Sequence, residues 1–128
     1  MSDPTPAYDS GNIFARILRG EIPCDKVYED EHVLAFNDIH PQAPVHVLVI
    51  PKGAYVSLAD LSARGSDTEI AALFRAVGAI ARQIGAEADG YRILANTGVN
   101  AHQEVPHYHV HLFAGRKLGP MLSRKGGE

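Results

Sequence analysis

The segment His107-Tyr-His-Val-His-Leu-Phe113 carries a histidine at every second position. Because successive side chains leave a β-strand on opposite faces, a strand here places His107, His109 and His111 on one face and the apolar residues on the other. The apolar face can pack on a core, and the imidazoles then point into a groove. Packing alone gives no reason for three alternating histidines, so the row indicates a functional site.

Clustered imidazoles serve either metal binding or catalysis. A tetrahedral metal site holds each ring nitrogen about 2.0–2.1 Å from one ion. Side chains two apart on a strand are separated by about 6.6 Å of backbone rise, so three in a row do not converge easily. Catalysis fits better, because a reference pKa near 6.5 lets one neutral ring attack while another, charged, neutralises an anion. We expect no metal at this site.

The elements that would position the row follow from periodicity and turn residues. Alternating or continuous apolar runs predict strands at residues 26–29, 33–37, 46–50 and 91–95. Apolar residues at helical spacing predict a long helix that begins at a Ser66 or Asp67 cap and stops at Gly85. A short helix capped by Asn12 should precede the strands, and residues 57–61 can form a single turn.

Composition limits the class of protein. With 128 residues the chain is large enough for one domain with its own core. The net charge of -3 gives no electrostatic reason to bind nucleic acid. Cys24, the single cysteine, excludes an internal disulfide and fits a cytoplasmic protein, and no apolar run is long enough for a membrane span. Residues 1–11 are polar, lack the apolar core of a signal peptide and are predicted to be disordered.

The alternating row resembles the histidine triad (HIT) motif of nucleotide hydrolases and transferases. Three other segments resemble the Hint branch of that family: Asn12-Ile-Phe-Ala-Arg-Ile, the stretch at residues 35–52, and Gly115-Arg-Lys-Leu-Gly-Pro-Met. The resemblance implies an α+β fold of about five mainly antiparallel strands with one long and one short helix. It places the HIT domain at residues 12–122 and a tail at residues 123–128. It also implies a homodimer, formed through the long helix and the strand that precedes the triad.

The resemblance further implies a role for each site residue. His109 would be the nucleophile, with His107 and His46 orienting the set, while His111 would stabilise phosphoryl charge or, when protonated, supply a proton to the leaving group. Asp38 would bind both ribose hydroxyls. The residues implied to bind nucleotide are Ile13, Phe14, Ile17, Phe36, Asn37, Asp38, Ile39, Asn96, Gln103, Glu104, Val105, His109 and His111.

The implied reaction is hydrolysis of a purine nucleoside 5'-phosphoramidate through a nucleotidyl-histidine. The phosphate loop departs from the family pattern at two places. Glu104 stands where some relatives have a serine, and Ala101-His102 replaces a glycine pair. No cofactor is implied, and residues 12–15 lack the Cys-x-x-Cys by which some bacterial relatives hold zinc. Three alternatives remain: a dinucleoside polyphosphate hydrolase, a nucleotide-binding regulatory dimer without turnover, and a metal-binding protein.

Overall fold

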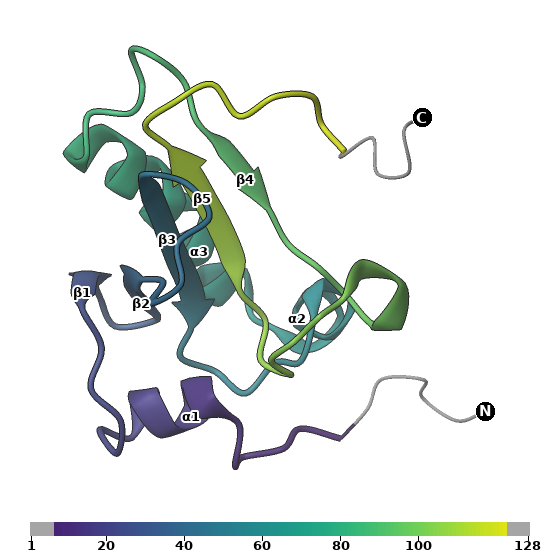
Figure 1. Ribbon diagram of the computed structural model, residues 1–128. Helices are drawn as coiled ribbons and strands as arrows, with labels where there is room; N and C mark the ends of the chain where they lie inside the picture. Colours follow the sequence, from purple (N-terminus) through teal and green to yellow (C-terminus); the bar gives the residue numbers. More distant parts are fainter. Residues whose placement is uncertain (1–6, 123–128) are drawn as a thin grey trace.

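A five-stranded antiparallel sheet with the strand order β1-β2-β3-β5-β4 organises the computed structural model, which describes residues 7–122 (Figure 1). The strands are β1 (Lys26–Glu29), β2 (Val33–Asn37), β3 (Val45–Pro51), β4 (Arg92–Leu94) and β5 (Val110–Ala114). The helices are α1 (Ile13–Leu18), α2 (Leu58–Arg64) and α3 (Asp67–Gln83), with a 3-10 turn, η1 (Val99–Ala101), before β5. This arrangement confirms the predicted α+β class.

The long helix α3 begins and ends where its sequence predicts. The Ser66 hydroxyl accepts the Glu69 N–H and the Glu69 carboxylate accepts the Ser66 N–H, which together form a capping box. Gly85 follows with φ of +74°, a conformation that favours glycine. The helix α2 is longer than the single predicted turn. Its additional length is stabilised by the buried Asp60, which accepts the Val56 N–H and pairs with Arg64.

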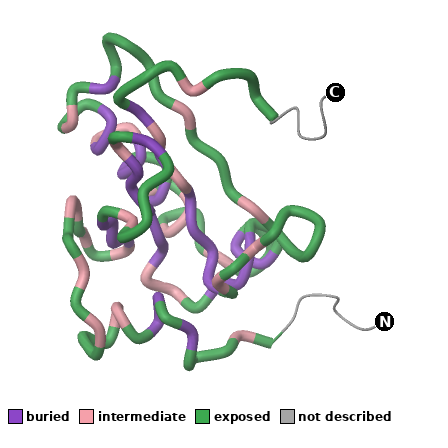
Figure 2. Tube along the Cα trace, in the orientation of Figure 1, coloured by how far each residue is buried: buried purple, intermediate pink, exposed green. Residues whose placement is uncertain are grey.

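The two faces of the sheet carry separate cores, with α3 behind β3 and β5 (Figure 1) and buried residues along these strands (Figure 2). One face packs on α3, and its core contains Val33, Val47, Val49, Leu73, Val77, Ile80, Val110 and Leu112. The other face packs on α1, and its core contains Phe14, Leu34, Phe36, Leu48 and Ile50. Alternation along β5 therefore assigns His111 to the α1 side, because it pairs with Leu48 on β3.

The strand β5 is shorter than the histidine row, and its start corrects the predicted boundary. His107 and His109 precede Val110, where the ladder to β3 begins. The residue opposite Tyr108 would be Pro51, which has no N–H to donate, and the Tyr108 N–H donates instead to the Tyr55 carbonyl. His107 is fully buried and does not face a groove as its spacing suggests.

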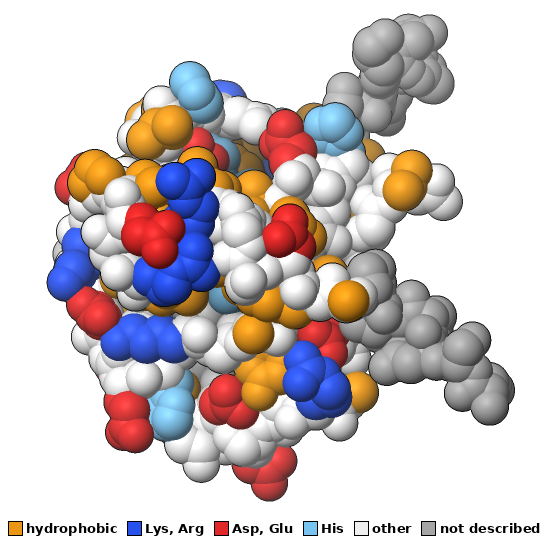
Figure 3. Space-filling model, turned by 90° about the horizontal axis from the view of Figure 1, so that it is seen from below, with side chains coloured by type: hydrophobic (Ala, Val, Ile, Leu, Met, Phe, Trp, Pro, Cys, Tyr) orange, Lys and Arg blue, Asp and Glu red, His pale blue; other side chains and the backbone are white. Residues whose placement is uncertain are grey.

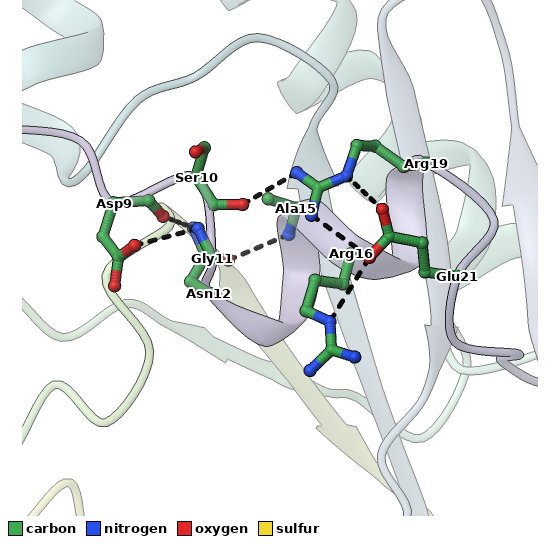
Figure 4. A network of polar contacts seen from close by, with 8 residues as sticks. All are labelled: Asp9, Ser10, Gly11, Asn12, Ala15, Arg16, Arg19 and Glu21. Carbon is green, nitrogen blue, oxygen red and sulfur yellow. Dashed lines mark hydrogen bonds and ion pairs between the residues drawn. The ribbon is translucent and has the colours of Figure 1, made fainter.

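The N-terminal segment predicted to be disordered divides into two parts. Residues 1–6, like residues 123–128, lie outside the described residues, so the domain limits stay a prediction. Residues 7–11 lead into α1, and the carbonyls of Asp9 and Ser10 accept hydrogen bonds from Asn12 and Arg19, which flank the helix (Figure 4). Among the described residues, no helix has the length and apolar character needed to cross a membrane.

Candidate active site

A cavity of about 280 Å³ lies between α1, the end of β2 and the segment that leads into β5. All but two of the predicted nucleotide-binding residues line it: Ile13, Phe14, Ile17, Phe36, Asn37, Asp38, Ile39, Glu104, Val105, His109 and His111. The exceptions are Asn96 and Gln103, which belong to the loop after β4. His46 and His107 stand behind the wall of the cavity, where they contact His111 and His109.

His109 presents one unprotonated ring nitrogen. Its Nδ1 lies 2.7 Å from the His107 carbonyl, which can only accept, so Nδ1 carries the proton. Burial lowers the pKa of His109, although the hydrogen bond to the His107 carbonyl opposes this effect. The neutral ring therefore keeps a lone pair on Nε2. The edge of the Phe14 ring packs against the imidazole, with centroids 5.0 Å apart, and limits its rotation.

His111 carries its proton on the opposite nitrogen, because a chain of hydrogen bonds begins at a backbone amide. The Gln42 N–H donates to Nδ1 of His46 over 3.1 Å, which leaves the His46 proton on Nε2. That nitrogen lies 2.9 Å from Nδ1 of His111 and 3.5 Å from a carboxylate oxygen of Asp38. His111 is then protonated on Nε2. Burial, followed by the proximity of His109 and His46, lowers the pKa of His111 to about 4.

His107 is held from both sides. Its Nε2 donates to the Pro51 carbonyl over 2.8 Å, and its Nδ1 lies 2.6 Å from the hydroxyl of Tyr8. Burial lowers the pKa of His107 to about 4, although the bond to Pro51 opposes this effect. The ring is therefore neutral at pH 7.

Gln103 uses its whole side-chain amide within the protein. Its Oε1 accepts the Gly98 N–H over 3.0 Å, and its Nε2 donates to the carbonyls of Val56 and Val105 at 2.7 and 3.0 Å. These bonds occupy both amide protons, so Gln103 braces the loop from behind. Glu104 lines the cavity beside His109, and His102 lies 3.7 Å from its carboxylate on the outer side.

Asp38, His46 and His111 form the one group among the described residues whose ligand atoms could surround a metal ion, within 4.8 Å of one another. A metal there would need lone pairs on Nε2 of His46 and Nδ1 of His111. His46 would then carry no proton, because its Nδ1 already accepts the Gln42 N–H. The 2.9 Å contact between Nε2 of His46 and Nδ1 of His111 therefore suits a shared proton better than a bound cation. The absence of a metal stays a prediction.

Four residues that line the cavity were not predicted from the sequence. Ile22, Pro23, Cys24 and Leu48 also line the cavity. Leu48 could have been found, because alternation on β3 places it on the same face as His46. The other three belong to the irregular segment after α1. Neither they nor Tyr8 show a periodic signal that would reveal their position.

Comparisons of sequence and of structure with known proteins agree on one family. The HIT domain family model matches residues 19–118. A purine nucleoside phosphoramidase of Escherichia coli is 46% identical over 114 residues, covering 89% of this chain and 95% of the relative. An uncharacterised HIT-like protein of Azospirillum brasilense is 67% identical and covers 91% of this chain and 96% of its own length. A solved HIT family hydrolase of Clostridium thermocellum superimposes with a TM-score of 0.81 at 36% identity, covering 88% of this chain and 97% of that structure.

Proposed function

Because this chain belongs to the HIT domain family, we propose that it hydrolyses purine nucleoside 5'-phosphoramidates, giving a nucleoside monophosphate and an amine. The E. coli relative that is named a purine nucleoside phosphoramidase supports this choice of substrate. One observation carries the proposal. His109 keeps a lone pair on Nε2 at a cavity where His111 offers an N–H.

The reaction divides into two displacements at phosphorus. Nε2 of His109 attacks the α-phosphorus, forming a bond to the nucleotide while the bond to the amine nitrogen breaks and the amine takes up a proton from protonated His111. Water then attacks the same phosphorus, returns one proton to His111, releases the nucleotide and regenerates the neutral His109 ring. The His107 carbonyl accepts the His109 Nδ1–H and can stabilise the positive charge that develops on the ring in each step.

His111 acts as a neutral donor before substrate binds. Burial lowers its pKa to about 4, so it is uncharged at pH 7 in the free protein and must take up a proton before it can supply one to the leaving group. Its Nε2–H can donate to a phosphoryl oxygen. The bound phosphoryl anion raises the pKa of a neighbouring imidazole, and we propose that protonation of His111 accompanies substrate binding.

The cavity suits a small nucleotide. Apolar side chains of α1 and the following segment, such as Ile13, Ile17 and Cys24, offer a surface on which a purine ring can pack. Asp38, just past the end of β2, also lines the cavity, where its carboxylate can accept from ribose hydroxyls. On the face shown in Figure 3, Lys and Arg side chains alternate with Asp and Glu, without the continuous basic patch that nucleic acid favours.

The proposal is tested by incubating the purified protein with AMP joined to lysine through a P–N bond, in buffer with EDTA. AMP and lysine should form in equal amounts, and rapid quenching should trap nucleotide on a peptide containing residues 107–111. Activity lost in EDTA and restored by zinc would contradict the metal-free chemistry. Preferential cleavage of diadenosine tetraphosphate would favour the polyphosphate hydrolase, and AMP binding without turnover of either substrate would favour a regulatory protein.

A further inference from the structure

Tyr8, in the segment before α1, reaches the buried histidine cluster. Its hydroxyl lies 2.6 Å from Nδ1 of His107, and its ring packs edge-on against the imidazole with centroids 5.6 Å apart. Among the described residues, no other group hydrogen-bonds to that nitrogen.

The direction of this hydrogen bond follows from the partner on the other side of the ring. The Pro51 carbonyl can only accept, so Nε2 of His107 carries a proton. Burial lowers the pKa of His107 to about 4, which keeps the ring neutral and its Nδ1 unprotonated at pH 7. The Tyr8 hydroxyl must therefore donate to Nδ1. Both hydrogen bonds therefore run in one direction: Tyr8 donates to His107, and His107 donates to the Pro51 carbonyl.

His107 in turn positions His109 through its backbone. The His107 carbonyl accepts the His109 Nδ1–H over 2.7 Å, the bond that keeps Nε2 of His109 unprotonated. The Phe14 ring packs edge-on against both imidazoles, with centroids 6.3 Å from His107 and 5.0 Å from His109. Tyr8 and Pro51 anchor the His107 side chain, so loss of either contact would let residue 107 shift and with it the carbonyl and the aromatic contact that set the His109 ring.

The segment that carries Tyr8 is fixed to α1 by polar contacts (Figure 4). The buried Asn12 donates from Nδ2 to the Asp9 carbonyl over 2.7 Å, and its Oδ1 caps α1. Arg19, just past the last residue of α1, donates to the Ser10 carbonyl over 2.7 Å. Tyr8 is thus held by the same helix that forms one wall of the cavity.

We propose that Tyr8 is a positioning residue of the active site, whose hydroxyl holds His107 in its Nε2-protonated form and thereby holds the carbonyl that orients His109. The inference rests on the function proposed above for the part that concerns catalysis. The hydroxyl leaves the reacting atoms untouched and acts only through His107.

The test compares Tyr8→Phe with Tyr28→Phe. Phenylalanine at position 8 keeps the aromatic ring and removes only the hydroxyl. Tyr28 is a matched control, because its hydroxyl also makes one hydrogen bond, to Asp30, and neither residue lines the cavity. For each variant the measurements are kcat and KM for AMP-lysine, the melting temperature, and, in the ligand-free protein, the ring ¹⁵N shifts of His107 and His109 and the solvent exchange of the His109 Nδ1–H.

Tyr8→Phe should lower kcat by about 3- to 10-fold, the effect of losing one neutral hydrogen bond, with KM changed less than about 2-fold. The His107 Nδ1 signal should shift and the His109 Nδ1–H should exchange faster with solvent, while Tyr28→Phe leaves kcat, KM and both ring signals unchanged. If wild type turns over substrate and Tyr8→Phe matches it in kcat and in both ring signals, the inference is overturned and the proposed function stands. If wild type shows no turnover, the proposed function fails, and the ring signals alone then support or overturn the positioning of His107 by Tyr8.

Discussion

His109 differs from the other histidines of the row in leaving an unprotonated ring nitrogen, Nε2, at the cavity, whereas Nε2 of His111 carries the proton. Nδ1 of His109 is bound to a carbonyl, whereas His107 has both nitrogens engaged and His111 has its Nδ1 engaged by His46. Spacing alone ranks the three equally, since alternation places them on one face. The ranking comes from the backbone carbonyl of His107, a partner that no side-chain pattern reveals.

We predict that His109→Ala lowers kcat by several orders of magnitude, as loss of a nucleophile does. AMP binding should survive, because Asp38 and the apolar wall remain. His107→Asn should lower kcat much less, because the role that we propose for His107 is only to orient the reacting ring. Single-turnover kinetics with AMP-lysine and calorimetric titration with AMP measure the two effects. A His109→Ala protein with near-normal turnover would falsify the assignment.

Asp38 has a contact at each of its two carboxylate oxygens. One carboxylate oxygen accepts the His40 N–H over 2.8 Å, and the other lies 3.5 Å from Nε2 of His46. Asp38→Ala should weaken AMP binding by about 1–3 kcal/mol, the range for a hydrogen bond to a charged group. Asp38→Asn keeps an oxygen for His40 and separates loss of the ribose contact from loosening of the loop. Equal losses for AMP and 2',3'-dideoxy-AMP would remove Asp38 from the ribose site.

At the scale of elements, periodic segments were predictable and their connections were not. The core of β3 and both ends of α3 follow from apolar runs and caps that lie within the element itself. The start of β5 depends on Pro51 across the sheet, and the bracing of the loop by Gln103 depends on Val56, 47 residues away. Most of the cavity wall was predictable only through the family resemblance, because its residues come from segments far apart in the sequence.

The loop before β5 should lose its shape when Gln103 is changed to Leu. The substitution removes all three hydrogen bonds of the side chain, so the Gly98 amide should exchange faster in the ligand-free protein, and kcat/KM should fall about 10-fold. Gln83→Leu is the matched control, since Gln83 donates one bond to the Val27 carbonyl outside the site. Unchanged exchange at Gly98 together with reduced activity would instead point to direct contact between Gln103 and substrate.

The whole molecule should lose stability as pH falls from about 6.5 to about 4. Both His107 and His111 have pKa values lowered to about 4 by burial, below the ordinary 6.5, so the unfolded chain binds more protons in this window. Their contribution to the free energy of unfolding is complete above pH 6.5 and is lost as pH falls through the window. Each histidine contributes a slope of at most about 1.4 kcal/mol per pH unit. Urea denaturation at several pH values measures the slope. His107→Asn should flatten it, and an unchanged slope in that variant would exclude His107 as a cause.

The sheet ends at β4, whose outer edge pairs with no strand among the described residues. The strand and its flank expose Tyr91, Ile93 and Leu94. Ile93 pairs with Leu112 and therefore faces the side covered by α3, where Phe74 is also exposed. An unpaired edge beside exposed apolar side chains favours association with another chain. We propose that two copies pair along β4, as the family resemblance implies.

If the pairing is correct, the wild-type protein should have the mass of a dimer by light scattering at micromolar concentration. Ile93→Lys should shift it to the monomer, because the substitution places a charge at the centre of an apolar contact. Leu58→Lys is the matched control: Leu58 is an exposed leucine on α2, 48% accessible and far along the chain from β4, and its substitution should leave the dimer intact. A monomeric wild type would contradict the dimer itself. A dimeric Ile93→Lys protein would instead move the contact away from β4.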